Sequence, residues 1–442
     1  MPAIYYTKMN YSEAIDFLFN KTLVFQHIGA QAYKPGLETT LELSNIFGNP
    51  HAGLKAIHIA GTNGKGSTAH LLAAILQQSG YKVGLYTSPH LVDFRERIRV
   101  NGKMINEENV VNFIERFLNS KYNDRHPSFF ELTTIMAFDY FKSEGVDYAV
   151  IETGLGGRLD STNILSPILS IITNISFDHT QFLGDTLAKI AGEKAGIIKS
   201  NTPVVIGESD VETTPVFTQK AEKVCAPIVF AESENEIISA VKVDDKWYLH
   251  TRSFGDIVDE LSGDCQLKNA NTVLSAVNIL REKGVEISDD AVCSGFAHVC
   301  KLTGLMGRWM KISDSPATYC DTGHNTGGIQ YIAKQLRSAE CTALRIVIGF
   351  VSDKDVNHIL EMMPKDATYY FTQASVKRAM CSVDLSQIAN KYNLKGNVYP
   401  DVQTAYTQAL TESTTSDMIY IGGSTFIVAD LLTYLKNNSA DK

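Results

Sequence analysis

The chain has 442 residues, 44% of them hydrophobic, and a formal net charge of −9. This length is sufficient for two or three domains with a large buried core. Acidic and basic residues are mixed along the chain without a long basic run, so we expect no nucleic-acid partner. No run approaches 18 apolar residues, and no basic segment followed by an apolar one opens the sequence. We therefore expect a cytoplasmic protein that does not enter a membrane.

Cysteine usage agrees with that compartment. The seven cysteines are scattered without a C-x-x-C pair, and their number is odd. This pattern indicates neither a disulfide framework nor a zinc site, so we expect reduced thiols.

The first 230 residues show short apolar, β-branched runs that alternate with helical patterns. Each run ends in Gly, Ser, Thr, Asn or Glu, and the five runs are residues 55–61, 82–87, 147–154, 168–176 and 202–208. This alternation predicts parallel strands joined by crossover helices. Residues 91–106 contain an Asn-Gly turn, which indicates a hairpin or an irregular excursion at the edge of the sheet.

Two further regions follow along the chain, and each has a different sequence pattern. Residues 228–254 alternate around an Asp-Asp turn and predict a small antiparallel unit, followed by helices over 270–284 and 288–299. A second α/β series follows, with strands in 317–323, 344–350, 367–373 and 417–423 and a last helix over 424–438. We expect a P-loop parallel-sheet domain over residues 1–300, a smaller Rossmann-like α/β domain over 301–442, and a hinge in 301–309.

The sequence GTNGKGS, residues 61–67, lies between a predicted strand and a helix that we expect to begin near Ser67. In that context backbone N–H groups of the loop, with the positive end of the helix, can bind phosphate. The glycines permit the tight path that this requires. Lys65 would lie at the β and γ phosphates and Ser67 at Mg²⁺ or a phosphate. We expect the nucleotide to contact the loop at Thr62, Asn63, Gly64, Lys65, Gly66 and Ser67; a generic glycine turn is the alternative.

Further chemistry-bearing residues follow later strands. Glu152 ends the apolar strand DYAVI, at the sheet edge where ligands bind in open α/β folds, and its carboxylate suits Mg²⁺. A solvated strand-end acid is the alternative for Glu152, and a structural histidine is the alternative for His179 in NISFDHTQFLG. Lys194 in AGEKAGIIK, taken by itself, is typical of a surface residue of an amphipathic helix.

In order along the chain, GTNGKGS, LYTSPHL, IETGLGGRLDSTN, FDHTQFLG, AGEKAGIIK, MGRW and DTGHN resemble the folylpolyglutamate synthase and dihydrofolate synthase branch of the Mur ligase superfamily. The resemblance implies an ATP-dependent acid–amino-acid ligase of folate biosynthesis. It would add L-glutamate to dihydropteroate, to folates or to both through an acyl phosphate. Its partners would be small molecules, and we expect a monomer. Another Mur-type ligase of peptidoglycan precursors, and a P-loop NTPase switch, are the competing hypotheses.

The resemblance also assigns roles to residues. It implies catalytic roles for Lys65, Glu152, His179 and Lys194, with Lys194 carbamylated, and a site for two Mg²⁺ ions at Ser67, Ser88, Glu152 and His179. It places ATP at Asn269, Arg308, Asp321 and His324, although Cys265, Thr322, Gly323 and Thr326 depart from the family pattern. It places the pteroate-bearing substrate at Lys34, Pro35, Gly36, Leu37, Phe129, Phe130, Glu131, Leu159, Asp160 and Ser161. For Phe129, Phe130 and Glu131 a core position is the alternative. The role of GFVSDKD, residues 349–355, stays open.

Overall fold

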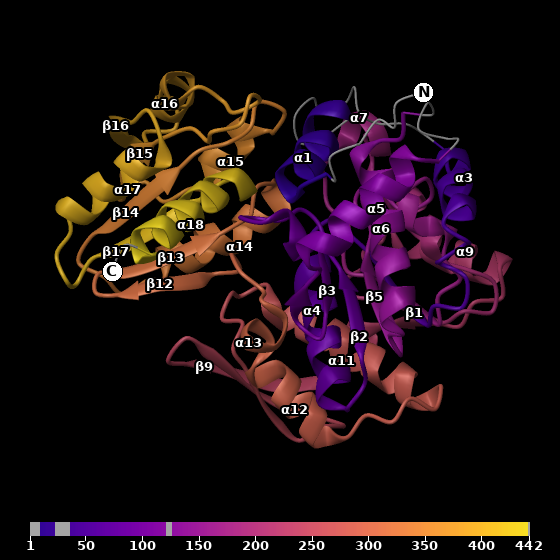
Figure 1. Ribbon diagram of the computed structural model, residues 1–442. Helices are drawn as coiled ribbons and strands as arrows, with labels where there is room; N and C mark the ends of the chain where they lie inside the picture. Colours follow the sequence, from indigo (N-terminus) through magenta and orange to yellow (C-terminus); the bar gives the residue numbers. More distant parts are fainter. Residues whose placement is uncertain (1–8, 23–35, 121–125, 441–442) are drawn as a thin grey trace, which may run out of the picture.

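The computed structural model describes residues 9–22, 36–120 and 126–440, and Figure 1 shows the path of the chain. Within these ranges the strands form three sheets. The largest has the order β4-β3-β2-β5-β1-β6-β7-β8. Its strands are β1 (Ala56–Ala60), β2 (Val83–Tyr86), β3 (Ile98–Val100), β4 (Lys103–Met104), β5 (Tyr148–Glu152), β6 (Leu169–Ile172), β7 (Val204–Ile206) and β8 (Ile228–Phe230).

The centre of this sheet is parallel, as the sequence predicts. β1 lies between β5 and β6, and Ile59 is in register with Glu152 on one side and Ile171 on the other. Strands β1, β2, β5 and β6 are buried along their whole length, which explains their continuous apolar sequences. The Asn101–Gly102 turn joins β3 and β4 into an antiparallel hairpin at the sheet edge, which confirms that prediction.

Helices cover the large sheet on both faces. They are α1 (Tyr11–Asp16), η1 (Phe17–Lys21), α3 (Glu38–Ile46), α4 (Lys65–Gln78), η3 (Phe94–Arg97), α5 (Glu107–Leu118), α6 (Phe129–Glu144), η5 (Ser161–Ile164), α7 (Thr180–Leu183), α8 (Leu187–Lys194), η6 (Ala195–Ile197), α9 (Thr214–Lys223) and α10 (Ala231–Glu234). Residues 66–76 of α4 are all buried, because α11 (Gln266–Glu282) and α12 (Asp289–Ala297) pack on the helix from outside. This burial fixes the start of α4 firmly against the sheet.

A three-stranded antiparallel sheet and the helices after it follow the large sheet in sequence. Its strands are β9 (Ile237–Val243), β10 (Lys246–Thr251) and β11 (Asp256–Asp259), and α13 (Val299–Thr303) follows α12. These elements confirm the predicted antiparallel unit and the two predicted helices. The β9–β10 turn touches the C-terminal sheet: Asp245 Oδ2 accepts hydrogen bonds from Tyr319 Oη at 2.5 Å and from Lys311 Nζ at 3.1 Å.

The C-terminal part, residues 310–440, is a mixed sheet in the order β12-β13-β17-β14-β15-β16. Its strands are β12 (Met310–Asp314), β13 (Ala317–Asp321), β14 (Leu344–Ile348), β15 (Thr368–Phe371), β16 (Lys395–Val398) and β17 (Met418–Gly422). Its helices are α14 (Thr326–Arg337), α15 (Val356–Met362), α16 (Ser382–Asn390), α17 (Val402–Thr411) and α18 (Thr425–Ala440). β12 is antiparallel to β13, and the other pairs are parallel.

The two-part α/β architecture is therefore the one expected from the sequence. In Figure 1 the C-terminal part, orange to yellow, lies beside the larger part that carries α4 and the large sheet. Of the helices in the described ranges, none combines the length and the apolar character needed to cross a bilayer. The division into residues 1–300 and 301–442, and the hinge in 301–309, stay predictions.

Gly84 in β2 makes the packing of α6 testable. A Cβ on Gly84 would lie 2.8 Å from the ring of Phe141, which is fully buried. We expect Gly84→Ala to lower the free energy of unfolding by about 1–3 kcal/mol through overpacking, as measured by urea unfolding. Adding Phe141→Leu should recover part of the loss. Gly192→Ala, which has open space around its new Cβ, is the control; an equal loss there would contradict the packing argument.

Candidate active site

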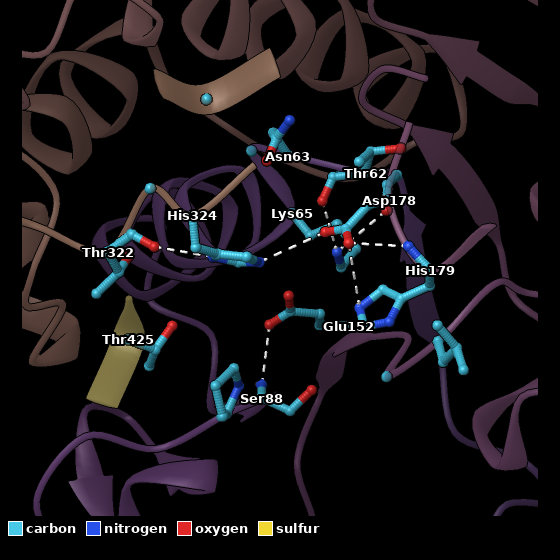
Figure 2. Close-up of a pocket in the computed structure, with 18 of the residues that line it drawn as sticks. Thr62, Asn63, Lys65, Ser88, Glu152, Asp178, His179, Thr322, His324 and Thr425 are labelled. Carbon is cyan, nitrogen blue, oxygen red and sulfur yellow. Dashed lines mark hydrogen bonds and ion pairs between the residues drawn. The ribbon is translucent and has the colours of Figure 1, made fainter. Parts of the chain in front are cut away.

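A cavity of about 360 Å³ lies where the large sheet, the linker before α11 and the C-terminal part meet. Its wall includes the residues that follow β1, β5 and β6 and those that follow β13 and β14. Parallel strands of one sheet end at a common edge, so segments that are far apart in sequence converge here. Figure 2 shows the side chains that point into this space.

The GTNGKGS loop forms one wall, and its path depends on glycine. Gly61 and Gly64 have positive φ angles of 152° and 82°. A Cβ on Gly61 would lie 1.8 Å from Thr173 Oγ1, and one on Gly64 would lie 2.2 Å from Asn269 Oδ1. Both glycines are therefore required by conformation and by space. Helix α4 begins at Lys65, two residues earlier than predicted, because the Gly64 carbonyl oxygen already accepts a hydrogen bond from the Thr68 N–H at 2.9 Å.

The first turn of α4 holds a polar atom without a protein partner. The Ser67 side chain is buried, and within the described residues its Oγ has no hydrogen-bond partner. Such an atom is costly unless a ligand satisfies it. Lys65 Nζ donates to the carbonyl oxygens of Gly61 at 3.0 Å and Thr62 at 3.1 Å, which holds its ammonium group over the loop. A helix N-terminus with this lysine and a free hydroxyl suits phosphate or a phosphate-bound cation.

Glu152 lies at the end of β5, beside this loop, and a Cβ on Gly66 would lie 3.9 Å from its Oε2. Its side chain is buried, so the alternative of a solvated strand-end acid is wrong. Glu152 Oε2 accepts a hydrogen bond from the Ser88 N–H at 3.0 Å, as Figure 2 shows. Burial raises the pKa of Glu152, while the charges of Lys65 and Arg308 oppose that rise. The carboxylate thus faces cations that favour its ionised form.

Asp178 and His179 follow β6 on the same edge. Burial lowers the pKa of His179 to about 4, so its imidazole is neutral and able to bind a cation at neutral pH. Burial acts to raise the pKa of Asp178, but a hydrogen bond from His324 and the charge of Lys354 hold it well below its usual range. His179 therefore stands beside an ionised carboxylate.

Lys194, the last residue of α8, is buried, so the surface alternative is wrong. Its Nζ donates to the carbonyl oxygen of Gly61 at 3.0 Å. Burial, together with the nearby charge of Lys65, lowers the pKa of Lys194 to about 7. A large fraction of this amine is neutral near pH 7, which an ordinary surface lysine would not be.

The segment before β12 and the start of the C-terminal part supply another wall. Arg308 donates through Nη1 to the hydroxyl of Thr322, and a Cβ on Gly66 would lie 3.2 Å from Arg308 Nη2. The guanidinium group thus lies against the start of α4. Asp321 accepts hydrogen bonds from the N–H groups of Trp309 at 2.6 Å and Gly323 at 2.7 Å.

Two more residues predicted at this wall also border the cavity. His324 Nδ1 lies 2.9 Å from the Thr322 carbonyl oxygen, and the ring points into the cavity in Figure 2. Asn269 is buried beside Gly64, and its Nδ2 donates to Gln266 Oε1 at 2.8 Å. The loop and the C-terminal part thus enclose the cavity from two sides.

The residues expected at the pteroate-bearing substrate divide into three groups. Six of them line the cavity: Phe129, Phe130, Glu131, Leu159, Asp160 and Ser161. Gly36 and Leu37 precede α3 and are not among the cavity-lining residues of the described ranges. Lys34 and Pro35 lie outside the described residues.

Two of these lining residues also hold the structure together. Glu131 Oε2 accepts hydrogen bonds from the N–H and hydroxyl groups of Ser128, which completes the capping box of α6. Phe129 is buried, and the Arg97 guanidinium lies 5.0 Å from the centre of its ring.

Asp160 is tied to its own loop. Its Oδ2 accepts from the N–H groups of Gly154 and Leu155, both at 2.9 Å, and its Oδ1 accepts from the N–H and hydroxyl groups of Thr162. The carboxylate therefore shapes the loop that leads from Glu152 to η5.

The donors around the cavity fit a divalent cation. Ser67 Oγ lacks a partner in the part of the chain that the structure describes, Glu152 is an ionisable carboxylate, and the imidazole of His179 is neutral. Among the described residues, no three His, Cys, Asp or Glu side chains cluster as a complete metal site. Phosphate oxygens and water would therefore complete the coordination, which is the usual arrangement for Mg²⁺.

The sequence did not single out several residues of this site. Asp178 precedes the predicted His179, and its acidic side chain in FDHT was an available signal. Lys354 lies in GFVSDKD, whose role was left open, and its Nζ is 2.5 Å from Asp178 Oδ1. Arg97 lines the cavity beside Phe129, but nothing in its local sequence distinguishes it from a surface arginine.

Comparison with known proteins gives consistent matches. Residues 59–277 match the Mur ligase middle domain, and residues 307–425 match the Mur ligase, glutamate ligase domain. The dihydrofolate synthase/folylpolyglutamate synthase of Bacillus subtilis is 32% identical over 418 residues, which cover 91% of this chain and 95% of that protein.

Solved structures agree with these matches. Escherichia coli FolC in complex with DHPP and ADP superposes with a TM-score of 0.84 at 28% identity, covering 98% of this chain and 99% of that one. The Yersinia pestis bifunctional folylpolyglutamate synthase/dihydrofolate synthase complexed with AMPPNP and Mn ion gives a TM-score of 0.79 at 27% identity, covering 97% and 98%.

The hydrogen bonds to Asp160 lead to a stability prediction. Asp160→Ala leaves the loop donors Gly154, Leu155 and Thr162 without their acceptor, so we expect the free energy of unfolding to fall by about 2–4 kcal/mol in urea unfolding. Asp185→Ala, at an exposed carboxylate, should leave it unchanged within the error of the measurement. Equal effects of the two substitutions would contradict the role assigned to Asp160.

Proposed function

Because the chain belongs to the Mur ligase family, in its folylpolyglutamate synthase and dihydrofolate synthase branch, we propose that it joins L-glutamate to dihydropteroate, to folates or to both, with ATP as the energy source. One observation carries this proposal. The buried Ser67 hydroxyl, which has no hydrogen-bond partner among the described residues, faces the same cavity as Glu152 and Arg308. This arrangement suits a triphosphate whose terminal group is held between the two parts.

The reaction needs an activated acid. A carboxylate oxygen of the folate substrate attacks the γ-phosphorus of ATP, ADP leaves, and an acyl phosphate forms. The amine of L-glutamate then attacks the acyl carbon, gives up a proton, and phosphate leaves as the amide forms. The protein contributes position and charge neutralisation rather than a covalent nucleophile.

Each cation of the site has a defined place in this scheme. Residues 61–67 and the N-terminus of α4 hold the phosphates, with Lys65 at the terminal groups. Arg308 stabilises the negative charge that develops during transfer, from the C-terminal side. We assign two divalent ions to Ser67, Ser88, Glu152 and His179; when bound, such ions neutralise the charge of the transferred group.

Substrate residues follow from the same layout. We assign Asn269, Asp321 and His324 to the nucleotide, and the wall around Phe130, Leu159 and Ser161 to the pterin-bearing substrate. Gly36 and Leu37 do not line the cavity, so a substrate contact at these two residues would have to lie outside it. A monomeric state and a cytoplasmic location stay predictions.

The decisive measurement is phosphate release with dihydropteroate and with tetrahydrofolate in parallel, each with and without L-glutamate. We expect release to require ATP, one of the two acids and L-glutamate. Glu152→Gln should lower kcat about 100-fold or more, because a charge at the transferring phosphoryl group is lost. Glu212→Gln, at an exposed position, is the control. Release that is indifferent to glutamate would count against the ligase.

Lys194 supports a proposed modification. We propose that its neutral amine adds CO₂ to give an anionic carbamate and a proton, which converts a buried cation into an anion beside the metal site. The pKa of about 7 supports this, because only the unprotonated amine reacts. Activity should then fall as the pH drops below 7, where the amine is protonated and the carbamate does not form.

The carbamate can be detected directly. With ¹³C-labelled CO₂ we expect one carbamate carbon resonance in the wild type that is missing in Lys194→Ala and present in the control Lys189→Ala. Lys189 is exposed and paired with Asp185. Removal of CO₂ should lower the wild-type rate, and its return should restore it. A wild type that shows no such resonance and is insensitive to CO₂ would refute the modification.

A further inference from the structure

The carboxylate of Asp178 connects the two parts of the molecule. Its Oδ1 accepts a hydrogen bond from Lys354 Nζ at 2.5 Å, and its Oδ2 accepts one from Asn325 Nδ2 at 3.0 Å. His324 Nε2 lies 3.5 Å from Oδ2, and Figure 2 shows the two side chains facing one another. The side chains of Asp178 and Lys354 are only 10% and 8% exposed. All three partners come from the C-terminal part, whereas Asp178 follows β6 of the large sheet.

The same carboxylate fixes the backbone of the next residue. Asp178 Oδ1 also accepts a hydrogen bond from the N–H of His179 at 2.9 Å. His179 has φ 50° and ψ 37°, a left-handed conformation that is unfavourable for a residue with a Cβ and needs support from its surroundings. Asp178 provides that support, and the conformation aims the His179 imidazole into the cavity.

Asn325 extends the connection to the phosphate-binding loop. Its Nδ2 is shared between Asp178 and Asn63 Oδ1, which lies 2.9 Å away. Its Oδ1 accepts from the Gly328 N–H at 2.9 Å and caps α14. The parts are close here, since a Cβ on Gly327 would lie 2.6 Å from Ser176 Oγ. One amide therefore binds the loop, the Asp178 carboxylate and its own helix.

We propose that Asp178 is a positioning residue that couples the approach of the C-terminal part, through Lys354 and Asn325, to the placement of His179 beside the phosphate-binding loop. The coupling rests on the proposed function and adds a condition to it: the metal-facing side chain is fixed only while the two parts are together. Phosphoryl transfer is then confined to the closed arrangement, in which the C-terminal part is already in place and loss of the acyl phosphate to water is limited.

Because the ion pair between Asp178 and Lys354 is buried, removal of either partner should have a measurable effect. An exposed ion pair contributes little, but removal of one partner from a buried pair leaves an uncompensated charge. Lys354→Met and Asp178→Asn should therefore each disturb the closed arrangement, and the double substitution should be little worse than either alone. The neighbouring pair Lys189–Asp185 is 63% and 78% exposed and gives a matched control cycle.

The first readout is kinetic. We expect Asp178→Asn and Lys354→Met to lower kcat for glutamate-dependent phosphate release about 10- to 100-fold, the range for residues that orient a metal-binding side chain. The KM for ATP should change by less than about threefold, since the substitutions leave residues 61–67, Asn269 and Asp321 unchanged. Lys354→Arg should recover part of the rate. Lys189→Met and Asp185→Asn should leave it unchanged.

The second readout does not need turnover. Small-angle X-ray scattering with the nucleotide analogue AMPPNP and Mg²⁺ should give a larger radius of gyration for Asp178→Asn and Lys354→Met than for the wild type and the control variants. Asn325→Asp tests whether these effects come from unfolding. Aspartate preserves the cap of α14 but places a second carboxylate opposite Asp178. This variant should show the same loss of kcat and the same expansion.

The outcomes separate the two proposals. Additive effects of Asp178→Asn and Lys354→Met, or wild-type kcat and radius in both variants, would overturn the coupling. A wild type without glutamate-dependent phosphate release would overturn the proposed function. The scattering comparison would still decide whether Asp178 holds the two parts together.

Discussion

The parallel pairing of β1 with β5 and β6 is the constraint on which the site depends. Because these strands run in one direction, the GTNGKGS loop, Glu152 and the Asp178–His179 pair all leave the sheet at one edge. Burial of α4 on both sides keeps the loop at a fixed height over that edge. The path of the loop requires glycine at both positions, because a Cβ on Gly61 would overlap Thr173 and a Cβ on Gly64 would overlap Asn269. The packing of the backbone therefore fixes the positions of these residues before any ligand binds.

The cavity is lined by six basic and six acidic side chains. Lys65 and Arg308 lie near the Glu152 carboxylate, while Asp178 is paired with Lys354. Burial raises the cost of each unpaired charge, so the pairing in this space is tight and specific. A neutral Lys194 amine and a neutral His179 imidazole relieve part of the positive charge. The cavity can therefore take up a polyanionic ligand together with its counter-cations.

Much of this could be predicted because it is local. Strand periodicity gave the parallel sheet, and the Asn-Gly and Asp-Asp turns gave the hairpin and the antiparallel unit. The S-x-x-E pattern at Ser128 and Glu131 was also a readable helix cap, although the acid was assigned to substrate instead. Asp178 and Lys354 could not be paired in advance, because 176 positions separate them and only the docking of the two parts brings them together. The pKa of Lys194 likewise depends on burial that no short segment reveals.

The contact of the β9–β10 turn with the C-terminal sheet limits how that sheet can move. Asp245 binds Tyr319 and Lys311 on β13 and β12, while the chain itself joins the two parts at residues 304–309. A movement that separates Lys354 and Asn325 from Asp178 therefore has to break these contacts, and the hydrogen bond from the Asp264 N–H to Gln335 Oε1 at 3.1 Å, or to turn about them.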